Sequence, residues 1–204
     1  EGAMIEPLAV AVHGVKQMGD VKGMNIAVLG AGPIGNLVAQ AAKGMGAAKV
    51  MITDVSDLRL KKAQECGIDV CVNTKNKDFG EVMVEAFGPD KADVIYDCAG
   101  NNITMGQAIK YARKGSVIVL VAVFAGMAEI DLAVANDHEL DIKSTMMYRH
   151  DDYVDGIKLV NEGKVHLRPL ISKTFAFKDY LEAYHYIDDN RETTMKVIIN
   201  VQEK

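Results

Sequence analysis

Short apolar runs alternate with longer amphipathic stretches along the chain from Met24 onward. This alternation is typical of a parallel sheet with helices on both of its faces. The runs are almost unbroken in Val, Ile and Leu, as expected for strands buried on both faces. The predicted strands cover residues 25–29, 50–53, 69–72, 94–96, 117–121 and 141–148. We therefore predict an α/β fold built on a doubly wound Rossmann sheet of six parallel strands.

Helices are predicted between these strands, at residues 33–45, 56–66, 79–87 and 102–112. The second of them has chemical signals at both ends. Ser56 is placed as an N-cap, Asp57 lies in the positive first turn, and Gly67 follows the last turn.

The rhythm changes after His150. The pattern there predicts a helix at 153–162, an extended segment at 171–177, a helix at 178–188 and a strand at 196–201. This tail does not repeat the β-α unit, so we expect it to belong to a neighbouring domain. The first residue is Glu1 rather than Met, within an apolar stretch, and we expect the chain to be part of something longer.

The sequence IAVLGAGPIGNLVAQAAK contains a GxGxxG motif between a buried strand and an amphipathic helix, formed by Gly30, Gly32 and Gly35. The first glycine allows a tight turn, the second lets the backbone approach a pyrophosphate, and the third lets helix and strand pack closely. Pro33 fits the first helical turn, where a missing N–H is no loss. The free N–H groups and the helix dipole there favour an anionic phosphate, so the motif predicts dinucleotide binding.

Asp54 follows the second strand, 24 residues after Gly30. An acidic residue at this point accepts hydrogen bonds from the adenosine ribose, and its charge repels the extra phosphate of NADP. The alternative is that Asp54 only caps the next helix, but Ser56 is better placed to do so. We therefore predict NAD rather than NADP as the cofactor.

Composition and charge narrow the class of protein further. A net charge of -5 and the absence of a tight Lys/Arg cluster argue against a nucleic-acid partner. No apolar run approaches the ~18 residues of a membrane span, and no secretion leader is indicated. Three single cysteines predict buried thiols in a reducing compartment, and hence a cytoplasmic protein: Cys66, Cys71 and Cys98.

Three further stretches combine with the glycine motif into a family pattern: IEPLAVAVHG, TDVSDLRLKKAQECGID and LDIKSTMMYR. Together they resemble the zinc-dependent medium-chain dehydrogenases of the sorbitol, xylitol and L-iditol group, over nearly the whole chain. The resemblance implies that residues 15–149 form the NAD-binding domain. It also implies that residues 1–14 and 150–204 belong to a GroES-like catalytic domain that is otherwise missing here.

The resemblance places Glu6 beside a catalytic zinc, as a ligand or through the metal's water, and makes Glu6 and Tyr148 the candidate catalytic residues. Without the family, Glu6 is only a carboxylate in an apolar stretch before a proline. His13 has no neighbouring ligand in the sequence and is interpreted as a structural histidine.

The resemblance also implies a set of cofactor contacts. Ile34 touches the cofactor, and Arg59 holds the adenosine ribose together with Asp54; the alternative for Arg59 is an exposed helix residue. The nicotinamide side is expected to be lined by Val121, Ala122, Val123, Thr145, Met146 and Met147.

One departure from the family concerns the substrate. Polyol dehydrogenases commonly carry Phe-Arg-Tyr where this chain has Met146, Met147 and Tyr148. A thioether offers little to the hydroxyls of a polyol. Arg149 stands one position later, and whether it compensates for the missing arginine stays open.

The implied activity is NAD-dependent, zinc-assisted oxidation of a secondary alcohol, such as sorbitol or xylitol, to a ketone. Two alternatives stay open: a non-catalytic NAD-binding module, or a related zinc enzyme acting on threonine, butanediol or a sugar phosphate. We expect these 204 residues alone to bind NAD and to turn over little, because the family's main zinc ligands have no matching segment. Pairing along the sixth strand is expected to give a homodimer or homotetramer.

Overall fold

A computed structural model of the chain describes residues 1–75 and 77–202. The main sheet contains β1 (Asn25–Leu29), β2 (Lys49–Asp54), β3 (Val70–Asn73), β4 (Val94–Asp97), β5 (Val117–Leu120) and β6 (Asp141–Ser144). The helices are α1 (Ile5–Lys16), α2 (Pro33–Gly44), α3 (Asp57–Glu65), α4 (Phe79–Phe87), α5 (Asn102–Tyr111), α6 (Leu132–Asp137), α7 (His150–Asn161) and α8 (Tyr180–Asp189). A second pair of strands is formed by β7 (Ile171–Ala176) and β8 (Lys196–Asn200).

The six strands of the main sheet are all parallel, in the order β3-β2-β1-β4-β5-β6. This confirms the predicted doubly wound Rossmann sheet. From β1 the chain first adds strands on one side, β2 and then β3, and afterwards on the other side, from β4 to β6. Ligands of such sheets bind at this switch point between β1 and β4, outside the carboxyl ends of the strands. The glycine motif follows β1 directly and so lies at that position.

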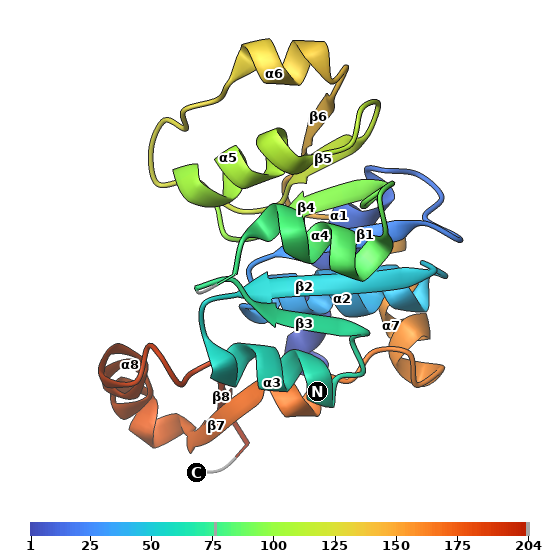
Figure 1. The fold of residues 1–204 in the computed structure, drawn as a ribbon. Helices are drawn as coiled ribbons and strands as arrows, with labels where there is room; N and C mark the ends of the chain where they lie inside the picture. Colours follow the sequence, from blue (N-terminus) through green and yellow to red (C-terminus); the bar gives the residue numbers. More distant parts are fainter. Residues whose placement is uncertain (76, 203–204) are drawn as a thin grey trace.

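Helices cover both faces of the sheet (Figure 1), and the side chains of neighbouring residues of one strand pack in opposite cores. Ile26 and Val28 of β1 pack in the core that α1, α2 and α7 cover. Ala27 and Leu29 pack in the other core, beneath α4 and α5. Burial on both faces explains why the strands show no alternation of apolar and polar residues.

The sixth strand is shorter than predicted. It ends at Ser144, which pairs with Leu120, the last residue of β5, instead of continuing to Tyr148. Since β5 also ends one residue before Val121, the ladder has no partner beyond that point. Met147 has φ of 59°, a left-handed conformation that does not occur within a regular strand.

Residues 5–16, which the sequence marked only as an apolar stretch, form α1. Pro7 is accommodated because it lies in the first turn, where the N–H has no helical partner. Leu8, Val12 and Val15 are fully buried and share the core with β1. The assignment of residues 1–14 to another domain stays a prediction, although α1 packs closely on α2 and α7.

The tail forms a small parallel pair of strands, β7 and β8, separate from the main sheet. The predicted helix from Lys178 is corrected: a 3-10 turn covers Phe177–Asp179, and α8 begins at Tyr180. Figure 1 shows this unit to one side of the main sheet. Leu181 and Tyr184 of α8 are 58% and 63% exposed, so apolar side chains face outward there.

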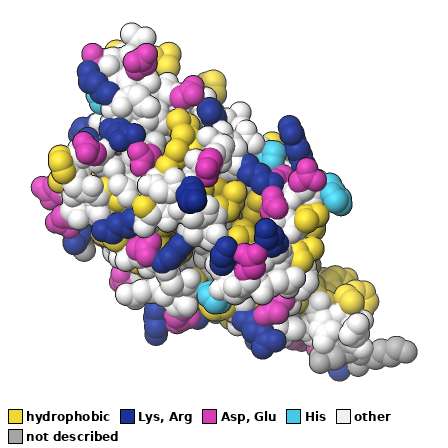
Figure 2. Space-filling view, turned by 90° about the vertical axis from the view of Figure 1, so that its right-hand side faces the viewer, with side chains coloured by type: hydrophobic (Ala, Val, Ile, Leu, Met, Phe, Trp, Pro, Cys, Tyr) yellow, Lys and Arg dark blue, Asp and Glu magenta, His cyan; other side chains and the backbone are white. Residues whose placement is uncertain are grey.

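Within residues 1–75 and 77–202, no helix is long and apolar enough to cross a membrane. On the face drawn in Figure 2, Lys and Arg side chains are interspersed with Asp and Glu.

Candidate functional site

The glycine motif makes the turn that joins β1 to α2. Gly30 has φ of 95°, which an L side chain rarely adopts. A Cβ atom on Gly35 would lie 1.8 Å from the carbonyl oxygen of Gly30, so this contact requires glycine. Gly32 is the N-cap of α2 and provides no capping side chain. The first N–H groups of the helix are thus open to an anionic ligand.

Asp54 lies at the end of β2, against this turn. Its Oδ2 accepts a hydrogen bond from the N–H of Ala31 at 2.7 Å, within the motif. Its Oδ1 accepts from the N–H groups of Val55 and Ser56 at 2.8 and 2.9 Å. The carboxylate is therefore fixed beside the turn, while Ser56 caps α3 by accepting from the N–H of Arg59, as predicted.

Arg59 lies in the first turn of α3 and faces Asp54. Its Nη1 is 3.9 Å from Asp54 Oδ2, and its side chain is 34% exposed. The Nε atom is buried and has no hydrogen-bond partner among the described residues. A guanidinium held in this way beside a carboxylate is available to a ligand that enters the same space.

A hollow of about 600 Å³ brings several of these residues together. Its lining comprises Gly30, Gly32, Thr53, Asp54, Val55, Arg59, Thr74, Cys98, Ala99, Asn101, Ile103, Thr104 and Gln107. Four of the predicted cofactor residues are in this set. Pro33, Ile34 and Gly35 stand at the start of α2, directly after Gly32.

The far wall of this hollow, from Cys98 to Gln107, was not predicted from the sequence. It depends on Asp97, which is fully buried at the end of β4. Its carboxylate accepts hydrogen bonds from the N–H groups of Ala99 and Gly100 and from the hydroxyl of Thr104. The available signal was an aspartate at a strand end followed by a glycine and the N-cap Asn101.

The predicted nicotinamide wall lies after β5 and β6, outside that lining. A Cβ on Gly100 would lie 2.7 Å from the Cβ of Ala122, so this wall adjoins the far side of the hollow. Val121 is 8% exposed and Val123 is 78% exposed. Thr145 is half-buried, whereas Met146 and Met147 are 68% and 56% exposed.

Glu6 and Tyr148, the candidate catalytic residues, come from α1 and from the segment before α7. The Tyr148 ring meets that of Tyr153 edge-on, with centroids 5.0 Å apart. Partial desolvation, the hydroxyl of Tyr148 and the negative charge of Glu6 together raise the pKa of Tyr153. Glu6 therefore lies within electrostatic range of Tyr153.

A zinc ion needs several converging ligands. Among the residues that the structure describes, no three His, Cys, Asp or Glu side chains are grouped to hold a metal ion. Glu6 therefore has too few partners within residues 1–75 and 77–202 to form a zinc site with them.

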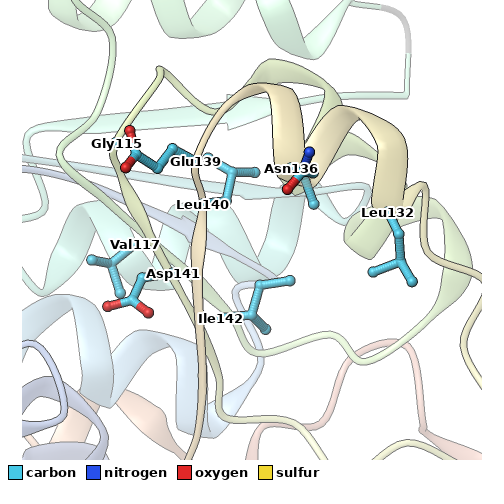
Figure 3. Close-up of a pocket in the computed structure, with 9 residues that line it drawn as sticks. Gly115, Val117, Leu132, Asn136, Glu139, Leu140, Asp141 and Ile142 are labelled. Atoms are coloured by element: carbon cyan, nitrogen blue, oxygen red, sulfur yellow. The ribbon is translucent and has the colours of Figure 1, made fainter.

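A second and larger hollow, of about 880 Å³, lies along β6 and α6 (Figure 3). Leu132 and Asn136 of α6 and Asp141 and Ile142 of β6 contribute to it. It borders the free edge of the sheet and shares no lining residue with the hollow at the glycine turn.

The three cysteines are free thiols. Burial raises the pKa of Cys66 and of Cys71 to about 11 each. Burial and the neighbouring Asp97 also raise the pKa of Cys98, which lines the hollow.

A doubly wound sheet with a glycine turn after β1 and a carboxylate after β2 defines a Rossmann-like domain of the dinucleotide-binding type. The chain belongs to the zinc-binding dehydrogenase family, whose model matches residues 33–162. It is 32% identical to sorbitol dehydrogenase 1 of Saccharomyces cerevisiae, over 98% of this chain and 57% of that protein.

Solved structures agree with this assignment. The 2R,3R-butanediol dehydrogenase of Bacillus subtilis has a TM-score of 0.88 and 28% identity, covering 98% of this chain and 57% of that one. An alcohol dehydrogenase of Escherichia coli CFT073, complexed with NADH, has a TM-score of 0.84 and 28% identity, covering 95% and 57%. The chain thus spans little more than half the length of the relatives it matches.

Proposed function

We propose that the protein oxidises a secondary alcohol, a polyol such as sorbitol or xylitol or a related compound, to a ketone with NAD and zinc, and that this chain supplies the cofactor-binding part. The observation that carries the proposal is Asp54, fixed at the end of β2 by the N–H of Ala31 within the glycine turn. Family membership and relatives named as dehydrogenases support it.

The residues of the turn fit a dinucleotide. Gly32 leaves the start of α2 open for the pyrophosphate, while Ile34 flanks it. Asp54 accepts hydrogen bonds from the ribose hydroxyls, and its charge disfavours the extra phosphate of NADP. Arg59 lies beside Asp54 and contacts the same ribose. The nicotinamide half extends towards Val121, Ala122 and Val123 and towards the segment 145–147. Bound there, NAD supplies the acceptor for the hydride.

The catalytic part of the proposal concerns Glu6 and Tyr148. Glu6 contributes to the zinc site, directly or through water, and the other ligands come from a part of the protein outside these 204 residues. The edge-on packing of Tyr148 on Tyr153, together with the electrostatic influence of Glu6 on Tyr153, supports a shared polar site at this end of α1.

The segment before α7 bears on the choice of substrate. Exposed thioethers at Met146 and Met147 give a polyol few hydrogen-bonding partners. Threonine, butanediol and sugar phosphates are therefore tested beside sorbitol and xylitol, by following NADH absorbance with zinc present. Cofactor binding without turnover of any alcohol by the complete protein would favour a non-catalytic NAD-binding module.

Calorimetric titration with NAD and with NADP tests the cofactor site. Asp54→Ala should weaken NAD binding by about tenfold or more, since a hydrogen bond to a charged group contributes roughly 1.5–3 kcal/mol. NADP binding should hold or improve, whereas a merely distorted turn would lose both cofactors. Asp57→Ala, three residues away on the exposed first turn of α3, is the matched control and should change neither.

We also propose a homodimer or homotetramer that pairs through β6. This strand is an edge of the main sheet, with a hollow partly lined by apolar residues beside it (Figure 3). The three free thiols support a reducing compartment, and the proposed location is the cytoplasm.

A further inference from the structure

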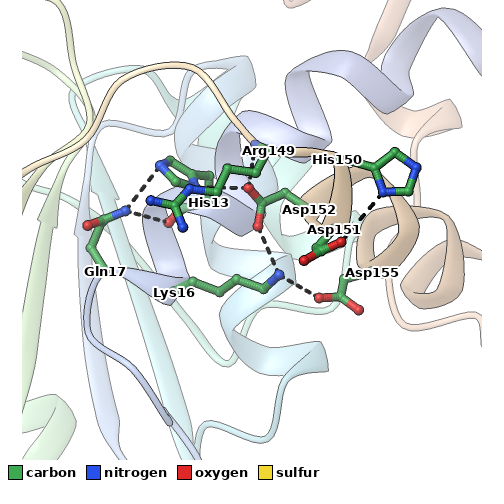
Figure 4. A network of polar contacts seen from close by, with 8 residues as sticks. All are labelled: His13, Lys16, Gln17, Arg149, His150, Asp151, Asp152 and Asp155. Atoms are coloured by element: carbon green, nitrogen blue, oxygen red, sulfur yellow. Dashed lines mark hydrogen bonds and ion pairs between the residues drawn. The ribbon is translucent and has the colours of Figure 1, made fainter.

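A charge cluster joins α1 to α7, on the face of the sheet opposite α4 and α5 (Figures 1 and 4). Its centre is Asp152, which is 2% exposed. Asp152 Oδ1 accepts a hydrogen bond from Lys16 Nζ at 2.8 Å, and Lys16 also pairs with Asp155 at 2.6 Å. His13 Nδ1 lies 2.9 Å from Asp152 Oδ2.

The second oxygen of Asp152 also holds the chain that leads into α7. Oδ2 accepts from the backbone N–H of Arg149 at 2.7 Å. With its proton on Nδ1, His13 donates to the same oxygen and accepts at Nε2 from Gln17, 3.2 Å away. A single carboxylate oxygen therefore connects α1 to the residue that follows Tyr148.

The segment 145–148, which leads from β6 into α7, is anchored to α1 at its other end as well. Lys143 Nζ donates to the carbonyl oxygen of Gln17 at 3.3 Å. A Cβ on Gly14 would be in ordinary contact, at 3.7 Å, with the Thr145 side chain, so α1 passes close to the start of the segment. The last ladder bond of the sheet runs from the N–H of Thr145 to the carbonyl of Leu120.

Between these anchors the segment has little support of its own. In the described part of the chain, the backbone N–H groups of residues 146–148 donate no hydrogen bond. Met147 has a left-handed backbone, and both methionines are largely exposed. The conformation of residues 145–148 is thus set by the contacts at its two ends.

We propose that His13 and Asp152, with Lys16, are positioning residues that hold the segment 145–148 against the nicotinamide half of the cofactor. This inference rests on the proposed function, because it takes residues 145–147 as part of the nicotinamide wall. His13 acts through Asp152 and the N–H of Arg149 and does not itself touch the cofactor.

The test compares the affinity for NAD with that for ADP-ribose, which lacks the nicotinamide. His13→Ala should lower NAD affinity by roughly fivefold, the scale on which residues outside a site influence it. ADP-ribose affinity should stay within about twofold, the usual margin for an unaffected contact. His13→Asn keeps a donor near the position of Nδ1 and should restore NAD affinity.

The matched control is Tyr96→Phe. It removes a different buried hydrogen bond to α1, from the Tyr96 hydroxyl to the carbonyl of Val15 at 3.0 Å, without touching the segment. It should lower thermal stability with no difference between the two ligands. The same preferential loss of NAD in this variant, or an equal loss of both ligands in His13→Ala, would overturn the proposal.

Asp152→Asn provides the second, stronger perturbation, and His13→Ala keeps the test decisive if that variant does not fold. The fluorescence emission of bound NADH, which comes from the nicotinamide ring, should shift towards that of the free cofactor in His13→Ala. It should return to that of the unmodified protein in His13→Asn. Failure of the unmodified protein to bind ADP-ribose would instead contradict the proposed cofactor site, so the two failures are distinguishable.

Discussion

The carbonyl oxygen of Gly30 occupies the space that a side chain on residue Gly35 would need. A Cβ built on Gly35 lies 1.8 Å from that oxygen and 3.3 Å from the Cβ of Cys98. The glycine turn, the start of α2 and the end of β4 are therefore packed together without room for one more carbon. This contact brings the open end of α2 close to the carboxyl ends of the strands.

Gly35→Ala should disturb both folding and cofactor binding. The added methyl forces backbone to move, and overpacking of this kind costs about 1–3 kcal/mol. Urea unfolding should show that loss, and calorimetry should show that NAD binding is lost with it.

Gly32→Ala is the matched control for that change. Its Cβ would meet nothing within 4 Å, so the free energy of unfolding should hardly change. If Gly32 serves the approach of a pyrophosphate, NAD affinity should still fall. Unchanged NAD affinity in Gly32→Ala would contradict the assigned phosphate site.

The thiols give a prediction that needs no cofactor. With pKa values of about 11, Cys66 and Cys71 should react slowly with Ellman's reagent in the native protein at neutral pH. All 3 cysteines should react after unfolding in guanidinium. Cys98 lines the hollow at the glycine turn, where we propose that NAD binds, so NAD should slow its remaining native reaction, whereas a rate independent of NAD would argue against that location for the cofactor.

Most of the main sheet was predictable because each strand is a dense apolar run bounded by polar or glycine residues. The helix α1 was not, since Leu8, Val12 and Val15 stand among alanines and valines that carry no distinct helical stripe. The predicted end of β6, at Tyr148, was also wrong, because the strand ends at Ser144. The pattern of residues 141–148 contains no sign that β5 has no partner to offer beyond Leu120.

The residues of the candidate site likewise fall into those that the sequence predicted and those that it did not. Gly30, Gly32 and Asp54 were singled out by the spacing of the motif and Arg59 by the family resemblance, and all four line one hollow. Asp97 was not, because its role depends on N–H groups that meet its carboxylate only in the folded loop. His13 was predicted to be structural, and the structure gives it a buried carboxylate partner 139 residues away.

The Asp152 cluster makes stability depend on pH at both extremes. Burial alone raises the pKa of Asp152, but the hydrogen bonds from Lys16 and from the N–H of Arg149 outweigh it and hold this pKa below 3.8. Burial likewise lowers the pKa of Lys16, but its bonds to Asp152 and Asp155 outweigh this and hold it above 10.5. The carboxylate's contribution is therefore lost as pH falls below 3.8, and that of the ammonium as pH rises above 10.5.

Asp152→Asn should accordingly cost about 3 kcal/mol at neutral pH, near the lower end for breaking a buried pair because Lys16 keeps Asp155. Urea unfolding of both proteins across the pH range should show the difference shrinking below 3.8 and above 10.5. His13 and Asp155 are the other titratable groups that face the pair. Asp155→Asn is the control: its side chain is 46% exposed, and the loss should stay under about 1 kcal/mol.

The proposed pairing through β6 can be tested by a change that spares the sheet itself. The N–H groups of Asp141 and Thr145 donate to β5, so in this alternating ladder the N–H of Ser144 points to the open edge. Ser144→Pro removes that outward donor and leaves the bonds to β5 in place. Sedimentation should show a shift from dimer to monomer, with circular dichroism and NAD affinity unchanged. A dimer that survives this substitution would locate the interface elsewhere, and the exposed apolar side chains of α8, Leu181 and Tyr184, would then be the next surface to change.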